Sequence, residues 1–133
     1  MSLARSLSLA FSAGALGGLA NSLAVWAFGA LGITQAVGVA IAPALTAAWL
    51  YPRIVWGGLW GLLLVLPLSF DWFRRGLVLS LAPSAVQLFV VFPLVAGKGT
   101  LGLELGPATP VLVLVFNAVW GVVASFWYRL GRR

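Results

Sequence analysis

Apolar runs that are much longer than a core helix needs are the feature that most constrains this sequence. A helix needs about 20 predominantly apolar residues to cross the hydrocarbon core of a bilayer. Residues 7–31, 77–96 and 109–128 meet this requirement directly. Of all residues, 62% are apolar and 8% are charged, against about 25% charged residues in an ordinary soluble domain. The sequence therefore predicts an all-α, polytopic membrane protein that forms a single domain in the lipid bilayer.

The first apolar run also resembles a signal peptide, because Arg5 is followed by apolar and small residues. The run continues to about Ile33, however, whereas the apolar region of a signal peptide has about 7–15 residues. We therefore expect residues 7–31 to be retained as the first transmembrane helix.

Residues 32–70 are mostly apolar and long enough for about two crossings, so they contain either one span or two. The positive-inside rule separates these alternatives, because Lys and Arg gather on the cytoplasmic side. A single span at residues 54–70 leaves only Arg53 and Lys98 on the outer side, whereas two spans move Arg5 to join them. We therefore predict four spans, with both termini on the cytoplasmic side of the inner (plasma) membrane. The cytoplasmic residues are then Arg5, Arg74, Arg75, Arg129, Arg132 and Arg133.

The apolar segment at residues 33–51 is then not expected to cross. Pro43 and Pro52 favour breaks within it, because proline removes a backbone donor and clashes with the preceding helical turn. Three interpretations stay open: a helix lying in the membrane interface, a re-entrant segment, and a fifth span.

The residue types exclude most kinds of catalysis. There is no Cys and no His, and the only acidic residues are Asp71 and Glu104. Thiol chemistry, His-based acid–base catalysis and the usual metal sites are therefore excluded, and we expect no enzyme, no cofactor and no metal. The net charge of +6 is better explained by membrane orientation and anionic headgroups than by nucleic acid, so no nucleic-acid partner is expected.

Small residues recur at four-residue spacing, which is typical of helices that pack closely in lipid. These stripes either pack the helices of one subunit or form the contact of a homo-oligomer. A chain with four short spans has little interior of its own, so we expect a homo-oligomer. The residues concerned are Ala10, Gly14, Gly18 and Ser22 in the first span, Gly57 and Gly61 in the second, and Gly121 and Ser125 in the last.

Aromatic residues cluster beside arginines near the expected span ends. Trp and Tyr rings prefer the headgroup region, and Arg side chains extend toward it. The sequence therefore predicts a set of membrane-interface anchors, which are Trp49, Tyr51, Arg53, Trp72, Arg74, Arg75, Trp127 and Arg129.

Three spans carry a side-chain amide near the bilayer midplane, namely Asn21, Gln87 and Asn117. Ser80 and Ser84 share a face with Gln87 on the third span. These residues either hydrogen-bond one another and fix the helix register, or they line a path for a neutral solute or an ion.

Three functions follow from these features. The first is a small oligomeric channel or facilitator lined by the midplane amides. The second is a non-catalytic membrane subunit that binds another membrane protein, and the third is a lipid-handling protein.

Overall fold

The computed structural model describes residues 1–133, and helices are its only regular secondary structure. Four helices are long and apolar enough to span a membrane, at Leu3–Ala30, Ala47–Val65, Trp72–Val95 and Thr109–Gly131. This confirms the all-α fold and the number of long helices. The elements are α1 (Leu3–Ala30), α2 (Ile33–Ala36), α3 (Ala47–Gly61) with the 3₁₀ turn η1 (Leu62–Val65), α4 (Trp72–Val86) with the π-helical η2 (Gln87–Val95), η3 (Thr100–Leu105) and α5 (Thr109–Gly131).

The second long helix differs from the predicted span at both ends. It begins at Ala47 rather than near Ile54, because the Thr46 side chain accepts a hydrogen bond from the Trp49 backbone N–H at 3.2 Å and caps the helix. It ends at Val65 because Leu66 is extended, as the residue before a proline prefers to be. Pro52 therefore lies inside α3 and not at its start.

The segment at residues 33–51 is not a single helix. Only α2 and the first turn of α3 are helical, and residues 39–46 between them have no regular structure. Gly38 has a positive φ of 75°, which favours glycine, and Pro43 disfavours a helical conformation of the residues before it. The extended part lies against α1, where Gly29 leaves room for Ala42, and its Ala40 N–H donates to the Leu105 carbonyl at 2.9 Å.

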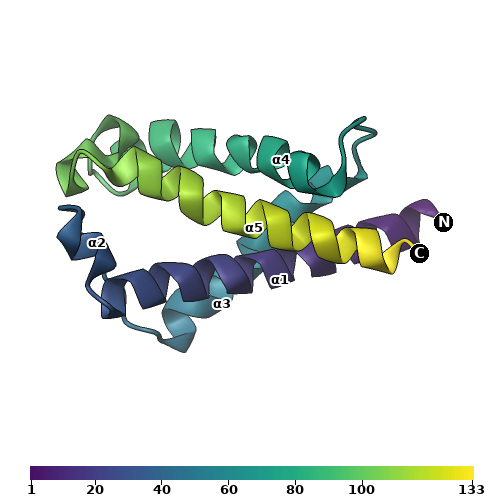
Figure 1. Cartoon of the computed structure of the whole chain (residues 1–133), viewed down its shortest axis with the longest axis horizontal. Helices are drawn as coiled ribbons and strands as arrows, with labels where there is room; N and C mark the ends of the chain where they lie inside the picture. The colour runs from purple at the N-terminus through teal and green to yellow at the C-terminus, as the bar shows by residue number, and fades with distance from the viewer.

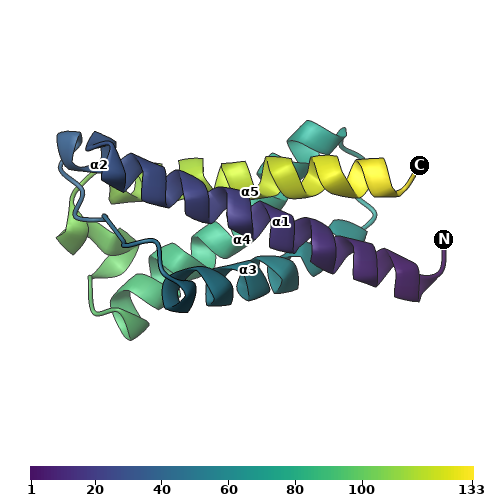
Figure 2. The same ribbon diagram turned by 90° about the horizontal axis from the view of Figure 1, so that it is seen from below.

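The four long helices form an open arrangement in which α1 and α5 are central. Helix α3 packs on α1, α4 packs on α5, and α3 and α4 barely contact each other. Figure 1 shows α5 between α4 and α1, and Figures 1 and 2 both place the two termini at the same end of the bundle. One side of the bundle, between α3 and α4, is therefore not closed by the chain itself.

Glycines allow the backbones of neighbouring helices to meet. Gly14 and Gly18 of α1 face Gly57 and Gly61 of α3, so that a Cβ at Gly57 would lie 2.7 Å from the Gly14 carbonyl oxygen. The predicted small-residue stripes are thus used for packing within the chain, and all eight predicted positions are buried. Between α4 and α5 the close approach is made by Gly121 and by Gly76, and Gly76 is not among the predicted positions.

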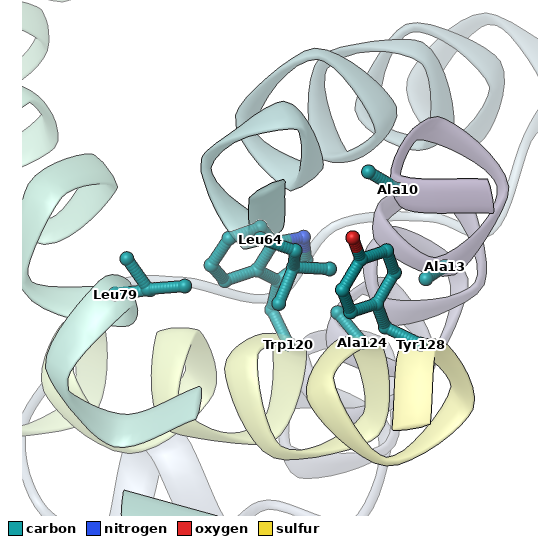
Figure 3. Close-up of a cluster of buried hydrophobic side chains, with 7 residues drawn as sticks. All are labelled: Ala10, Ala13, Leu64, Leu79, Trp120, Ala124 and Tyr128. Atoms are coloured by element: carbon teal, nitrogen blue, oxygen red, sulfur yellow. The ribbon is translucent and has the colours of Figure 1, made fainter. Parts of the chain in front are cut away.

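A buried apolar cluster lies where α1, η1, α4 and α5 meet (Figure 3). At its centre, the Trp120 indole Nε1–H donates to the carbonyl oxygens of Gly14 and Gly57, both at 3.2 Å. One side chain of α5 therefore ties together the backbones of α1 and α3. The cluster consists of Ala10, Ala13, Leu64, Leu79, Trp120, Ala124 and Tyr128.

Replacing Trp120 with phenylalanine is expected to lower the free energy of unfolding by about 1–3 kcal/mol, because the smaller ring loses the shared hydrogen bond and part of the buried contacts of the indole. Unfolding of the purified protein by sodium dodecyl sulfate in mixed micelles measures this change. Trp127→Phe is the matched control, since Trp127 is 45% exposed. Equal losses in the two variants would contradict a structural role for the Trp120 N–H.

Candidate functional site

The three predicted midplane amides lie together in the structure. The Asn21 Nδ2 group donates to the Phe116 carbonyl at 2.7 Å and to Asn117 Oδ1 at 3.5 Å. The Asn117 Nδ2 group in turn donates to Ser84 Oγ at 3.0 Å and to Gln87 Oε1 at 3.3 Å. Side chains from α1, α4 with its continuation η2, and α5 thus form one hydrogen-bonded group. We call Asn21, Arg53, Ser84, Gln87 and Asn117 the polar cluster, because Arg53 also joins it.

Ser80 is the one predicted lining residue that stays outside the polar cluster. Its hydroxyl donates to the Leu77 carbonyl of its own helix at 2.7 Å, and its backbone carbonyl accepts from the Ser84 hydroxyl. Such bonds to the preceding turn are the usual way for serine to satisfy its hydroxyl inside a helix. Ser80 therefore packs α4 against α5, close to Gly121.

The side chain of Arg53 points into the bundle, and not outward to the headgroups as predicted from the sequence. Its Nε donates to Ser22 Oγ at 2.9 Å and its Nη2 to Asn21 Oδ1 at 2.7 Å, and its guanidinium lies 4.7 Å from the centre of the Trp49 ring. The cause is the early start of α3 at Ala47, which places Arg53 in the second helical turn, facing α1.

The position of Arg53 along the bundle follows from its hydrogen-bond partners on α1. Asn21 and Ser22 are interior residues of α1, which ends at Ala30. At 1.5 Å per residue, they lie about 12 Å from the nearer end of the helix. The guanidinium therefore contacts the interior of a helix of membrane-spanning length.

No carboxylate neutralises Arg53. Asp71 and Glu104 are the only acidic residues in the chain, and both are exposed. Asp71 caps α4 and lies 3.7 Å from Arg74. The hydrogen-bond partners of Arg53 are all neutral, and an unpaired charge in such surroundings costs several kcal/mol. A residue that is costly to the fold in this way is a candidate for a functional site.

Two clefts meet at the polar cluster. The larger, of about 420 Å³, lies between α3 and η2 and extends past Trp56 and Trp60. The second, of about 380 Å³, extends toward the non-terminal end, past the extended residues 40–43 and Leu105. Both are open clefts and not sealed chambers. Four members of the polar cluster line both of them, which are Asn21, Arg53, Gln87 and Asn117.

The helix that carries Gln87 changes form at this residue. α4 ends at Val86, and residues Gln87–Val95 form a π-helix. π-Helical segments are rare and are found frequently at functional sites. Pro93 lies within the segment, where an ordinary α-helix would bring its ring against the Phe89 carbonyl. The change in helical form coincides with the level at which the two clefts meet.

The predicted interface anchors fall into two groups. Those near the terminal end of the bundle are exposed or half-buried, and Arg75 donates through Nη2 to the Leu64 and Leu66 carbonyls at the end of η1. Near the start of α3, Trp49 packs against Arg53, whereas Tyr51 is 63% exposed. Their location relative to headgroups stays a prediction. The first group comprises Trp72, Arg74, Arg75, Trp127 and Arg129.

Comparison with known protein families found no matching family model, and neither curated proteins nor solved structures gave a match. The fold and the site define the protein only by class. It is a helical protein with four helices of membrane-spanning length and an arginine–amide cluster between them.

Asn117 connects the polar cluster across the bundle, and this gives a testable expectation. Asn117→Leu removes the link between Asn21 and the side chains of Ser84 and Gln87, so we expect the free energy of unfolding to fall by about 1–2 kcal/mol. The same detergent unfolding measurement serves here. Val115→Leu, at an exposed position of α5, is the control and should change little. An unaltered stability of Asn117→Leu would show that the amides do not hold the helices together.

Proposed function

We propose that this protein is a small integral protein of the inner (plasma) membrane that acts as a channel or facilitator for a small anion. Both termini are assigned to the cytoplasm. This orientation is supported by the basic residues, because with Arg53 inside the bundle only Lys98 belongs to the loops at the non-terminal end. The six remaining arginines lie near the terminal end, as the positive-inside rule requires of a cytoplasmic face.

The observation that carries the proposal is the uncompensated guanidinium of Arg53 where the two clefts meet. A guanidinium has five N–H donors, and two of the Arg53 donors are used by Ser22 and Asn21. Up to three therefore remain for a ligand. An anion is the ligand that both accepts these hydrogen bonds and neutralises the charge.

The charge of Arg53 also indicates which kind of solute the site favours. A fixed positive charge without a counter-ion repels cations, and in a low-dielectric site this repulsion is much stronger than in water. A neutral solute gains hydrogen bonds but leaves the charge uncompensated. The amides alone suggest either a neutral solute or an ion as the permeant species. With Arg53 among them, a small anion fits the polar cluster best.

The open side between α3 and α4 favours a homo-oligomer. These helices barely contact each other, so the polar cluster is not sealed from the surrounding lipid by the chain alone. Packing of copies into a homo-oligomer would close this side and give the path protein walls, which polar groups at membrane depth require. The proposed channel is therefore oligomeric.

A flux assay tests the proposal. The protein is reconstituted into liposomes, and the efflux of chloride or nitrate is compared with that of potassium and of glycerol. We expect anion efflux well above that of empty liposomes, with no comparable potassium or glycerol efflux. Efflux of glycerol alone would show that the permeant species is a neutral solute and not an anion. The absence of any efflux would exclude the channel.

A second candidate is a non-catalytic subunit whose partner is another membrane protein. The same open side favours it, because a single helix of a partner would close the groove between α3 and α4. Mild-detergent purification followed by mass measurement distinguishes the two. A stoichiometric foreign chain would support the subunit, whereas self-association alone supports the oligomeric channel.

A further inference from the structure

A third cleft, of about 470 Å³, lies at the terminal end of the bundle and shares no lining residue with the two clefts at the polar cluster. Its walls come from the loop before α4, the first turn of α4 and the last two turns of α5. Four arginines line it, which are Arg75, Arg129, Arg132 and Arg133. The cleft is thus a basic pocket between two long helices, at the end of the bundle that we assign to the cytoplasm.

The positive charge of this cleft is not balanced within the chain. The only carboxylate side chain in its walls is that of Asp71. That carboxylate already accepts a hydrogen bond from the Arg74 backbone N–H at 2.8 Å and lies 3.7 Å from the Arg74 side chain. Arg74 itself is not part of the cleft wall. The four arginines therefore present a large excess of positive charge.

Two of these arginines are held in place. Arg75 donates through Nη2 to the Leu64 carbonyl and, at 2.6 Å, to the Leu66 carbonyl. The guanidinium carbons of Arg75 and Arg132 lie 5.8 Å and 5.3 Å from the centre of the same Tyr128 ring. Two like charges gathered around one ring repel each other, and an anion bound between them would remove the repulsion.

We propose that this cleft binds the phosphate group of an anionic membrane phospholipid. Arginine guanidiniums match phosphate oxygens in charge and in geometry. Basic pockets between transmembrane helices on the cytoplasmic side are a recurring kind of site for such headgroups. Phe70 and Trp72 also line the cleft, so an acyl chain has apolar surface beside the phosphate. The proposal does not depend on anion conduction through the polar cluster.

Native mass spectrometry of the detergent-solubilised protein tests the proposal, by titration with phosphatidylglycerol and with phosphatidylcholine of the same acyl chains. We expect phosphatidylglycerol to bind about tenfold more tightly or better. The double variant Arg129→Gln/Arg132→Gln should lose this preference. Both side chains are exposed, so the variant is expected to fold. Arg5→Gln is the control, since it removes a charge at the same end of the bundle but outside the cleft wall.

Two results would overturn the proposal. Equal binding of the two lipids would show that the cleft does not recognise an anionic headgroup. An equal loss of the preference in Arg5→Gln would show that the effect comes from overall charge and not from the cleft. Added inorganic phosphate distinguishes the source of the phosphate group. If millimolar phosphate displaces phosphatidylglycerol, the cleft belongs to a soluble phosphate compound and the lipid assignment fails. If millimolar phosphate does not displace phosphatidylglycerol, the lipid is the ligand.

Discussion

Gly57→Leu is expected to separate α3 from α1 and to lower the free energy of unfolding by about 3 kcal/mol or more. A Cβ at this position would lie 2.7 Å from the Gly14 carbonyl oxygen and 2.8 Å from the Gly18 Cα. Both neighbours are backbone atoms, so no rotation of a side chain relieves the clash. The helices must move apart, and the Trp120 hydrogen bond to the Gly57 carbonyl is lost with them. Detergent unfolding of the purified variant measures the loss.

Val55→Leu is the control for this substitution, because Val55 lies on the same helix and is 52% exposed. It adds a similar side chain where no backbone stands in the way and should leave stability nearly unchanged. A Gly57→Leu protein as stable as the Val55→Leu protein would contradict the close packing of α1 and α3. It would also remove the support for the position of Arg53, which depends on the same helix pair.

Arg53→Gln is expected to lower anion efflux from proteoliposomes about 10- to 100-fold. Hydrogen bonds to a charged group are worth about 1.5–3 kcal/mol, and each 1.4 kcal/mol corresponds to a factor of ten. The stability of the variant should not fall in parallel, since the substitution also removes an uncompensated charge from the bundle. Efflux and detergent unfolding, measured on the same preparation, separate these two effects.

Two further variants make the Arg53 result specific. Arg53→Lys keeps the charge but not the planar guanidinium, and it should retain more efflux than Arg53→Gln. Arg5→Gln removes a charge near the start of α1, outside both clefts of the polar cluster, and should conduct like the parent. If Arg53→Gln conducts like Arg5→Gln, Arg53 has no part in permeation.

Most of the helical architecture could be predicted from hydropathy alone, because bilayer thickness and helical rise together fix the length of a spanning helix. The same fixed rise brought Asn21, Gln87 and Asn117 to one level, and the structure joins them by hydrogen bonds. Four-residue spacing likewise identified the faces on which the helices pack. It did not identify the partner of each face, which depends on how the helices are arranged.

Arg53 could not be placed by the rules that placed the helices. Counting positive charges treats every arginine as a loop residue, and Pro52 suggested a helix start beside it. The signal that was missed is Thr46, a preferred N-cap residue followed by the helix-forming Ala47 and Ala48. Moving the helix start to this residue turns Arg53 from a boundary residue into an interior one. Ser22 was selected for its small size, and its role as a partner of Arg53 depends on that same shift.

The proposed channel requires the Arg53 guanidinium to bind an anion within the bundle. Nuclear magnetic resonance of ¹⁵N-arginine-labelled protein in nanodiscs tests it most directly, with the Arg53 Nε signal assigned by its loss in Arg53→Lys. On titration with chloride or nitrate, the Arg53 signal is expected to shift and saturate, while the Arg5 signal stays in place. An Arg53 signal that does not respond to either anion, or that shifts only as Arg5 does, would contradict the claim.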